Sequence, residues 1–252
     1  MSFDVGNLDL LLPVMARILS AFLVMPIFGH RSVPAIAKIV LAVSVAFLLV
    51  APGGVTARVP SDVTAYLLGL GTEILLGLLL GFAASLTFWA LGMAGDLVGL
   101  QMGWGFGGTI HPSFESSPIV TGQFYNIMGT LVFLVLGGQR LTLVALSNTF
   151  TKVPPFTLVM SSLQIGRILD LVTSLFSGAV QLALPIVGTL LLTEVVLAFL
   201  TRVMPQLNAW VFGMPLKVGI GILTLWISLP AVFILMTRWL TKAPFHMQYL
   251  VK

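Results

Sequence analysis

The sequence predicts an all-α membrane protein, built from about six long apolar segments that form kinked helical hairpins. Apolar residues make up 58% of the 252 residues and charged residues only 8%. The mean hydropathy is +1.09. A water-soluble domain would carry about a quarter charged residues. The chain also contains 14 prolines. Because several of them lie in or beside the apolar segments, the predicted helices are expected to bend.

Each apolar segment is close to the about 20 residues that a helix needs to cross a bilayer. Pro13 and Pro26 are expected to kink the first segment or to end it early. Ser61 or Asp62 is expected to cap the third. A more amphipathic stretch over 139–171, interrupted by Pro154-Pro155, is expected at an interface or against partners. In chain order the apolar segments cover residues 8–28, 34–50, 63–91, 120–136, 175–200 and 216–240.

Gly77 and Gly81 form a GxxxG pattern in the third segment. Such a pair allows two helix backbones to approach closely. Glycine is also common in membrane helices without any such role. The sequence leaves both interpretations open.

Residues 95–118 differ from the surrounding apolar segments because they cannot be helical throughout. Each of their closely spaced glycines lowers helix propensity by about 1 kcal/mol relative to alanine, and His111-Pro112 disfavours helical backbone. Non-helical backbone at membrane depth survives only where protein buries it or where it lines a watery cavity. We therefore weigh a pore plug evenly against an interfacial loop with its aromatic rings among lipid headgroups. The candidate plug residues are Met102, Gly103, Trp104, Gly105, Phe106, Gly107 and Gly108.

Ionisable residues within the apolar segments are the second group of candidate site residues. An intramembrane charge costs roughly 3 kcal/mol on insertion scales and therefore marks a functional candidate. The favoured interpretation is pairing between helices or subunits. The alternative is a proton relay in a self-contained proton-coupled secondary transporter. The acids are Glu73, Asp96 and Glu194, and the candidate bases are Arg17, Arg202 and Lys217.

The sequence shows no pattern that predicts an enzyme, a metal site or a cofactor. Its three histidines are far apart and form no HExxH pattern, and cysteine is absent. The glycines at 103–108 are not followed by the Lys-Ser or Lys-Thr of a phosphate loop. No basic run predicts nucleic-acid binding.

Three stretches, at 26–38, 94–103 and 183–216, together resemble the FliR/SctT family of type III secretion export-gate subunits. They contain Arg31-Ser32-Val33-Pro34, Gly99-Leu100-Gln101-Met102-Gly103 and Met204-Pro205-Gln206-Leu207-Asn208. The second stretch is closer to the flagellar branch than to the virulence branch. His111 stands where the family commonly has aspartate.

The resemblance implies an export-gate subunit in the bacterial inner membrane, at the flagellar basal body. With FliP and FliQ it would form a closed helical pore for unfolded export substrates, with FlhB wrapped around the pore and FlhA beneath it. Residues 1–174 would be FliP-like, with a plug loop at about 99–118, and residues 175–252 would form a FliQ-like hairpin. The hairpin tip is expected to contact a neighbouring subunit through Met204, Pro205, Gln206, Leu207 and Asn208.

Overall fold

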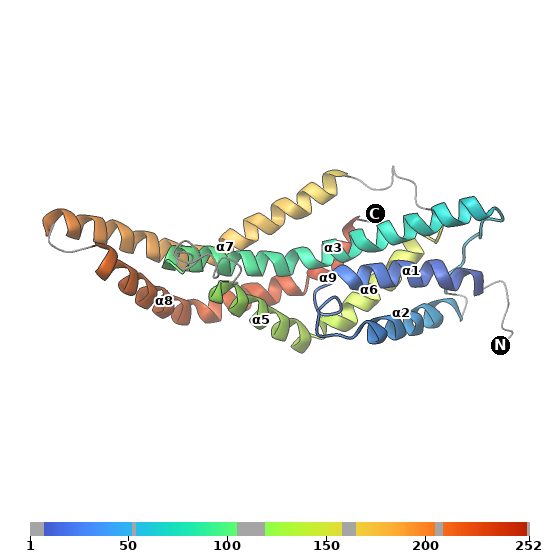
Figure 1. The fold of residues 1–252 in the computed structure, drawn as a ribbon, viewed down its shortest axis with the longest axis horizontal. Helices are drawn as coiled ribbons and strands as arrows, with labels where there is room; N and C mark the ends of the chain where they lie inside the picture. Colours follow the sequence, from blue (N-terminus) through green and yellow to red (C-terminus); the bar gives the residue numbers. More distant parts are fainter. Residues whose placement is uncertain (1–7, 52–53, 105–118, 158–164, 205–208, 251–252) are drawn as a thin grey trace. The chain divides into compact units, whose positions relative to one another are not determined.

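The computed structural model describes residues 8–51, 54–104, 119–157, 165–204 and 209–250 (Figure 1). Every regular element in these residues is a helix, so the predicted all-α class is confirmed for this part of the chain. The helices are α1 (Leu8–Val24), α2 (Ala35–Val50), α3 (Val63–Met102), α5 (Val120–Val135), α6 (Gly138–Lys152), α7 (Ile165–Val203), α8 (Ala209–Leu240) and α9 (Ala243–Leu250).

Three stretches of the described residues are long and apolar enough to cross a membrane, namely Val63–Met102, Gly166–Val203 and Val211–Leu250. The helices α5 and α6 add a fourth if the bent pair counts as one span. The expected number was about six. All six predicted segments are helical, but α1 has 17 residues and α2 has 16. Both are shorter than the about 20 residues that a straight crossing needs.

Several helix ends follow from local sequence signals. The helix α1 ends at Val24, before Pro26. Asp62 caps α3, because its Oδ2 accepts a hydrogen bond from the Ala65 N–H at 3.3 Å. The helix α6 ends at Lys152, and Val153 is extended (φ −127°, ψ 91°) because the residue before a proline disfavours helical backbone.

The C-terminal hairpin departs from the predicted bounds. Its second helix was expected to begin at 216, but α8 begins at Ala209 and contains Pro215 as well as Pro230. Its first helix was expected from 175, but α7 begins at Ile165 and continues through Pro185. Apolar helices tolerate interior prolines because neighbouring groups satisfy the freed backbone acceptors.

The chain divides into two compact units. Unit 1 comprises Met1–Thr87, Leu134–Val172 and Leu240–Lys252, and unit 2 comprises Phe88–Phe133 and Thr173–Trp239. These units are defined by contacts within the chain, whereas the predicted FliP-like and FliQ-like parts are defined by resemblance to other proteins. The predicted division therefore stays a prediction.

Unit 1 is organised by a close approach of α1 and α3. A Cβ placed on Gly77 would lie 2.3 Å from the Arg17 carbonyl oxygen, and one on Gly81 would lie 2.5 Å from that of Ala21. The GxxxG pair thus lies at a backbone-to-backbone contact. The helix α2 packs on α1, and α9 packs on α6.

Unit 2 explains why α3 continues to Met102, although the apolar segment was expected to end at about 91. Gly92, Gly95 and Gly99 face α5, and a Cβ on Gly95 would lie 2.5 Å from the Thr121 carbonyl oxygen. Close helix packing therefore offsets the low helix propensity of these glycines. In the same unit, Gly178 leaves room for the Trp239 ring, which a Cβ would meet at 0.8 Å.

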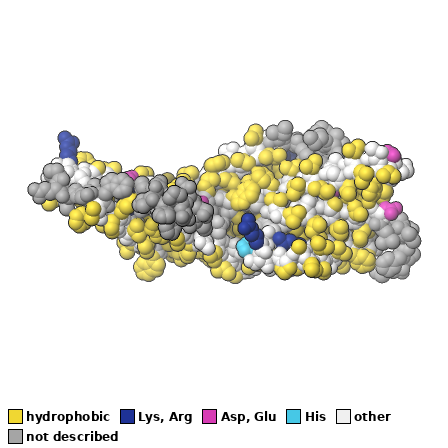
Figure 2. Space-filling model, in the orientation of Figure 1, with side chains coloured by type: hydrophobic (Ala, Val, Ile, Leu, Met, Phe, Trp, Pro, Cys, Tyr) yellow, Lys and Arg dark blue, Asp and Glu magenta, His cyan; other side chains and the backbone are white. Residues whose placement is uncertain are grey.

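The surface of the described residues is largely apolar. Figure 2 shows hydrophobic side chains spread over the visible face with few charged groups between them. On α7 and α8, Phe199 and Trp226 are among many exposed large hydrophobic side chains. Such a surface is that of a membrane protein.

Candidate functional site

The candidate plug segment begins at a specific helix end. The helix α3 stops at Met102, and Gly103 has a φ of +92°. The Gly103 N–H donates to the Leu100 carbonyl and the Trp104 N–H to the Gly99 carbonyl, both at 3.0 Å. This is the double hydrogen bond of a Schellman cap, in which glycine adopts the left-handed conformation without strain. The chain therefore leaves α3 in a defined direction.

Met102 holds this helix end against α8. Its side chain is fully buried. It lies over Gly221, where an added Cβ would come within 2.5 Å of the Met102 Cε. Trp104 is partly exposed. The other predicted plug residues, Gly105, Phe106, Gly107 and Gly108, lie outside the described residues, as does His111.

The two ends of this segment meet at one turn of α3. The Trp104 N–H donates a hydrogen bond to the Gly99 carbonyl. A Cβ on Gly99 would lie 2.2 Å from Cγ2 of Ile119. The chain thus departs and returns beside Gly99. One turn earlier, the Asp96 carboxylate lies over Gly122 in the first turn of α5, where an added Cβ would be 1.9 Å from Oδ1.

A cluster of three polar side chains joins α3, α7 and α8 beside Met102. Glu194 forms an ion pair with Lys217. Its other oxygen accepts a hydrogen bond from Gln101 Nε2 at 3.0 Å. The Glu194 side chain is 48% exposed and the Lys217 side chain 19%. We call Met102, Gly103, Gln101, Glu194 and Lys217 the plug root.

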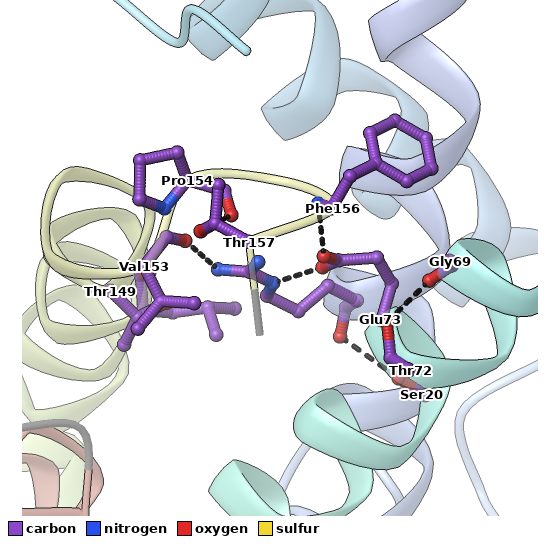
Figure 3. A network of polar contacts seen from close by, with 11 residues as sticks. Ser20, Gly69, Thr72, Glu73, Thr149, Val153, Pro154, Phe156 and Thr157 are labelled. Atoms are coloured by element: carbon purple, nitrogen blue, oxygen red, sulfur yellow. Dashed lines mark hydrogen bonds and ion pairs between the residues drawn. The ribbon is translucent and has the colours of Figure 1, made fainter. Parts of the chain in front are cut away.

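A second ion pair lies in unit 1, between α1 and α3 (Figure 3). Arg17 Nε lies 2.5 Å from Glu73 Oε2, and both side chains are 0% exposed. Arg17 Nη1 also donates to the Val153 carbonyl at 2.9 Å, and Glu73 Oε1 accepts from the Phe156 N–H at 3.1 Å. The Arg17 guanidinium lies 4.3 Å from the centre of the Phe150 ring. Every charge in this cluster is compensated within the chain.

The remaining predicted site residues are not brought together. Among the described residues, Asp96 has no Lys or Arg partner. Arg202 and Met204 are exposed at the end of α7. The rest of the predicted hairpin tip, Pro205, Gln206, Leu207 and Asn208, lies outside the described residues.

Sequence reasoning missed two features of these clusters. Gln101 was noted only as part of a motif, although it ties α3 to Glu194. Phe156 was not singled out, yet it is the one non-glycine residue with positive φ, at 64°, in the described part of the chain. Its only sequence signal is the preceding Pro154-Pro155 pair, which marks a turn without fixing its geometry.

The model of one protein family, described as bacterial export proteins, family 1, matches residues 8–243. The chain belongs to this family. Its relatives include the flagellar biosynthetic protein FliR of Aquifex aeolicus, 30% identical over 88% of this chain and 86% of the relative. FliR of Pectobacterium carotovorum is 34% identical over 86% and 82%. The surface presentation of antigens protein SpaR of Shigella flexneri is 33% identical over 64% and 62%.

The family match includes the plug root, both ion pairs and the α7–α8 hairpin. Most of α9, which begins at Ala243, lies beyond the matched residues. The candidate site therefore lies within the residues that match the bacterial export family.

Proposed function

We propose that the chain is a subunit of the flagellar type III secretion export gate, in the bacterial inner membrane at the basal body. With FliP and FliQ it forms a closed helical pore through which unfolded flagellar proteins pass. FlhB wraps around this pore and FlhA lies beneath it. The protein conducts its substrates and performs no bond chemistry. Membership of a bacterial export family and the similarity to flagellar biosynthetic proteins support this proposal.

The plug root is the observation that carries the proposed mechanism. A plug must be held firmly where it leaves the helix, and the residues beyond that point must be able to move. Met102 is buried over Gly221, and Gln101 is bonded to Glu194. Beyond this base, Trp104 and Phe106 alternate with glycines, which permit large backbone rotations. In the closed pore the aromatic rings form a hydrophobic constriction that excludes water and ions by dewetting.

Ion conductance tests the plug. Complexes containing Trp104→Ala together with Phe106→Ala are reconstituted in planar bilayers, and current is measured without substrate. Loss of both rings removes the constriction, so conductance rises well above that of the wild-type complex. The matched control is Phe245→Ala, because this aromatic side chain is 56% exposed on α9 and lies far in sequence from every residue of the plug root. Background conductance from correctly assembled double-variant complexes contradicts the plug assignment.

The exposed apolar surface of the hairpin supports a multi-subunit assembly. Of the apolar window in each candidate span, 67% is buried for α3, but only 22% for α7 and 11% for the stretch containing α8. We propose that FliP and FliQ cover part of this surface and that the tip at 204–208 contacts a neighbouring subunit. A photo-crosslinker at Gln206 then yields adducts with FliQ or FlhB. Exclusive labelling of the tip by a water-soluble reagent in the intact complex contradicts the contact.

Co-purification separates this function from the alternative transporter. A gate subunit is isolated with two other small hydrophobic proteins, whereas a self-contained transporter works as the purified chain alone. The pairing of Glu73 and Glu194 with Arg17 and Lys217 supports the gate, because these acids are engaged in ion pairs that join helices. A proton relay needs several carboxylates along one path, and in this sequence they are sparse.

A further inference from the structure

The turn over residues 153–157, between α6 and the start of α7, depends on the buried ion pair for its position. Arg17 Nη1 donates to the Val153 carbonyl at 2.9 Å. Glu73 Oε1 accepts from the Phe156 N–H at 3.1 Å. Figure 3 shows both contacts reaching the same turn from neighbouring helices. One ion pair therefore contacts the 153–157 turn at two points, Val153 and Phe156.

Phe156 is strained in this position. Its φ is 64°, in the left-handed region that side chains with a Cβ rarely adopt. Its ring fills a notch at Gly69, where an added Cβ would lie 2.3 Å from Cδ1. The Tyr66 ring lies 5.3 Å away between centroids. Because such strain persists only where the surroundings impose it, the ion pair and the notch hold Phe156 in this conformation.

Among the described residues, the other hydrogen bonds of the turn do not reach α1 or α3. The Thr157 N–H and Oγ1 donate to the Pro154 carbonyl within the turn, and the Val153 N–H donates to the Thr149 carbonyl of α6. Pro154 and Pro155 have no backbone N–H. The Phe156 N–H is thus the single backbone donor of residues 154–156, and Glu73 receives it. Loss of this hydrogen bond, or closure of the Gly69 notch, removes a contact between the turn and α3.

Release of the turn leaves the buried charges paired. The direct contact between Arg17 Nε and Glu73 Oε2 involves neither Val153 nor Phe156. Arg17 Nη2 is buried without a hydrogen-bond partner even while the turn is docked. The turn can therefore leave without exposing an uncompensated charge, the event that makes breaking a buried ion pair so costly.

We propose that the 153–157 turn is a conformational switch, docked in this structure and released as a unit while α1 and α3 stay folded. We call the Arg17–Glu73 pair the latch, because it holds the turn in the docked state. The backbone strain of the left-handed Phe156 favours release. This device belongs to unit 1, and it does not depend on the plug assignment.

Hydrogen exchange of the Phe156 amide tests the switch directly, because this amide donates to the latch. It is measured on the full chain within its membrane complex, by mass spectrometry with residue resolution. We expect the wild-type Phe156 amide to exchange by local opening, faster than the interior amides of α1 and α3. Exchange at the same rate as those amides overturns the proposal, because the turn then opens only when the helices unfold.

A pair of glycine variants tests the notch. Gly69→Ala drives the Phe156 ring from its place, so exchange of the Phe156 amide rises by about tenfold or more, while α1 and α3 keep their rates. Gly71→Ala is the matched control, since an added Cβ there meets nothing within 4 Å. Equal rates in the two variants, or acceleration of every helix alike in Gly69→Ala, overturns the proposal.

A double variant tests the latch without leaving a buried charge. Arg17→Met with Glu73→Leu replaces the pair by apolar side chains, which buried sites often accept without loss of stability. We expect the Phe156 amide to exchange about tenfold faster or more, with α1 and α3 protected as before. An unchanged Phe156 rate shows that the ion pair is no latch. None of these measurements depends on export or conductance, so their failure is distinct from failure of the proposed function.

Discussion

Two ion pairs in the described part of the chain, one in each unit, differ in how they are surrounded. Arg17–Glu73 and Glu194–Lys217 each join helices in apolar surroundings. The first pair is fully buried and also satisfies two backbone groups of the 153–157 turn. The second is partly exposed, on helices whose apolar surface is mostly uncovered within the chain. Unit 1 thus compensates the charges of its buried ion pair within the chain, whereas the α7–α8 hairpin exposes most of its apolar surface.

The largest effect that this comparison predicts is for Glu73→Ala. Removal of the carboxylate leaves Arg17 buried without a counter-charge, which costs about 3–5 kcal/mol. We expect a large loss of stability in the purified chain in detergent, measured by denaturant or thermal unfolding. Restoration of stability by the second substitution Arg17→Met assigns the loss to the unpaired charge. A single variant as stable as the wild type would show that Arg17 is not confined to the buried site.

A smaller effect is expected at the α1–α3 contact that brings the buried pair together. In Gly77→Ala the new methyl group meets the Arg17 carbonyl, which is backbone and cannot turn aside. Overpacking of this kind costs about 1–3 kcal/mol. The control is Gly71→Ala, which meets open space. It should be neutral or slightly stabilising, because alanine favours the helix. Similar unfolding midpoints for both variants would rule out a tight helix contact at Gly77.

The smallest effect on the isolated chain is expected for Glu194→Ala. Exposed ion pairs contribute about 0–1 kcal/mol, so unfolding in detergent should change little. If partner subunits cover this pair, the same variant lowers the yield of assembled complex much more than it lowers chain stability. Yield is measured as the fraction of the chain that co-purifies with its partners. A large loss of stability in the isolated chain would instead place Glu194 in an intramolecular core.

Local signals predicted local features of the fold and the site. Ser61 or Asp62 was expected to cap the third segment, and Asp62 caps α3. The GxxxG pair lies where α3 approaches α1. The glycine-rich segment was expected to be non-helical in part, and α3 ends just before Gly103, which has a positive φ. The expected start of that segment at 95 was wrong, because Gly95 and Gly99 lie in helix and pack on α5. Glycine lowers helix propensity but also permits close packing, and a propensity does not report which effect prevails.

By itself the sequence determined an all-α membrane protein, because hydropathy, segment length and glycine and proline placement act through neighbouring residues. It also supplied the charges that an apolar environment must compensate. Only the tertiary structure decided which charges meet: Arg17 and Glu73 are 56 residues apart, and Arg17 and Val153 are 136 apart. The left-handed Phe156 likewise exists because Glu73 and Gly69, distant in sequence, impose it. Such contacts depend on how helices pack, which no short stretch of sequence encodes.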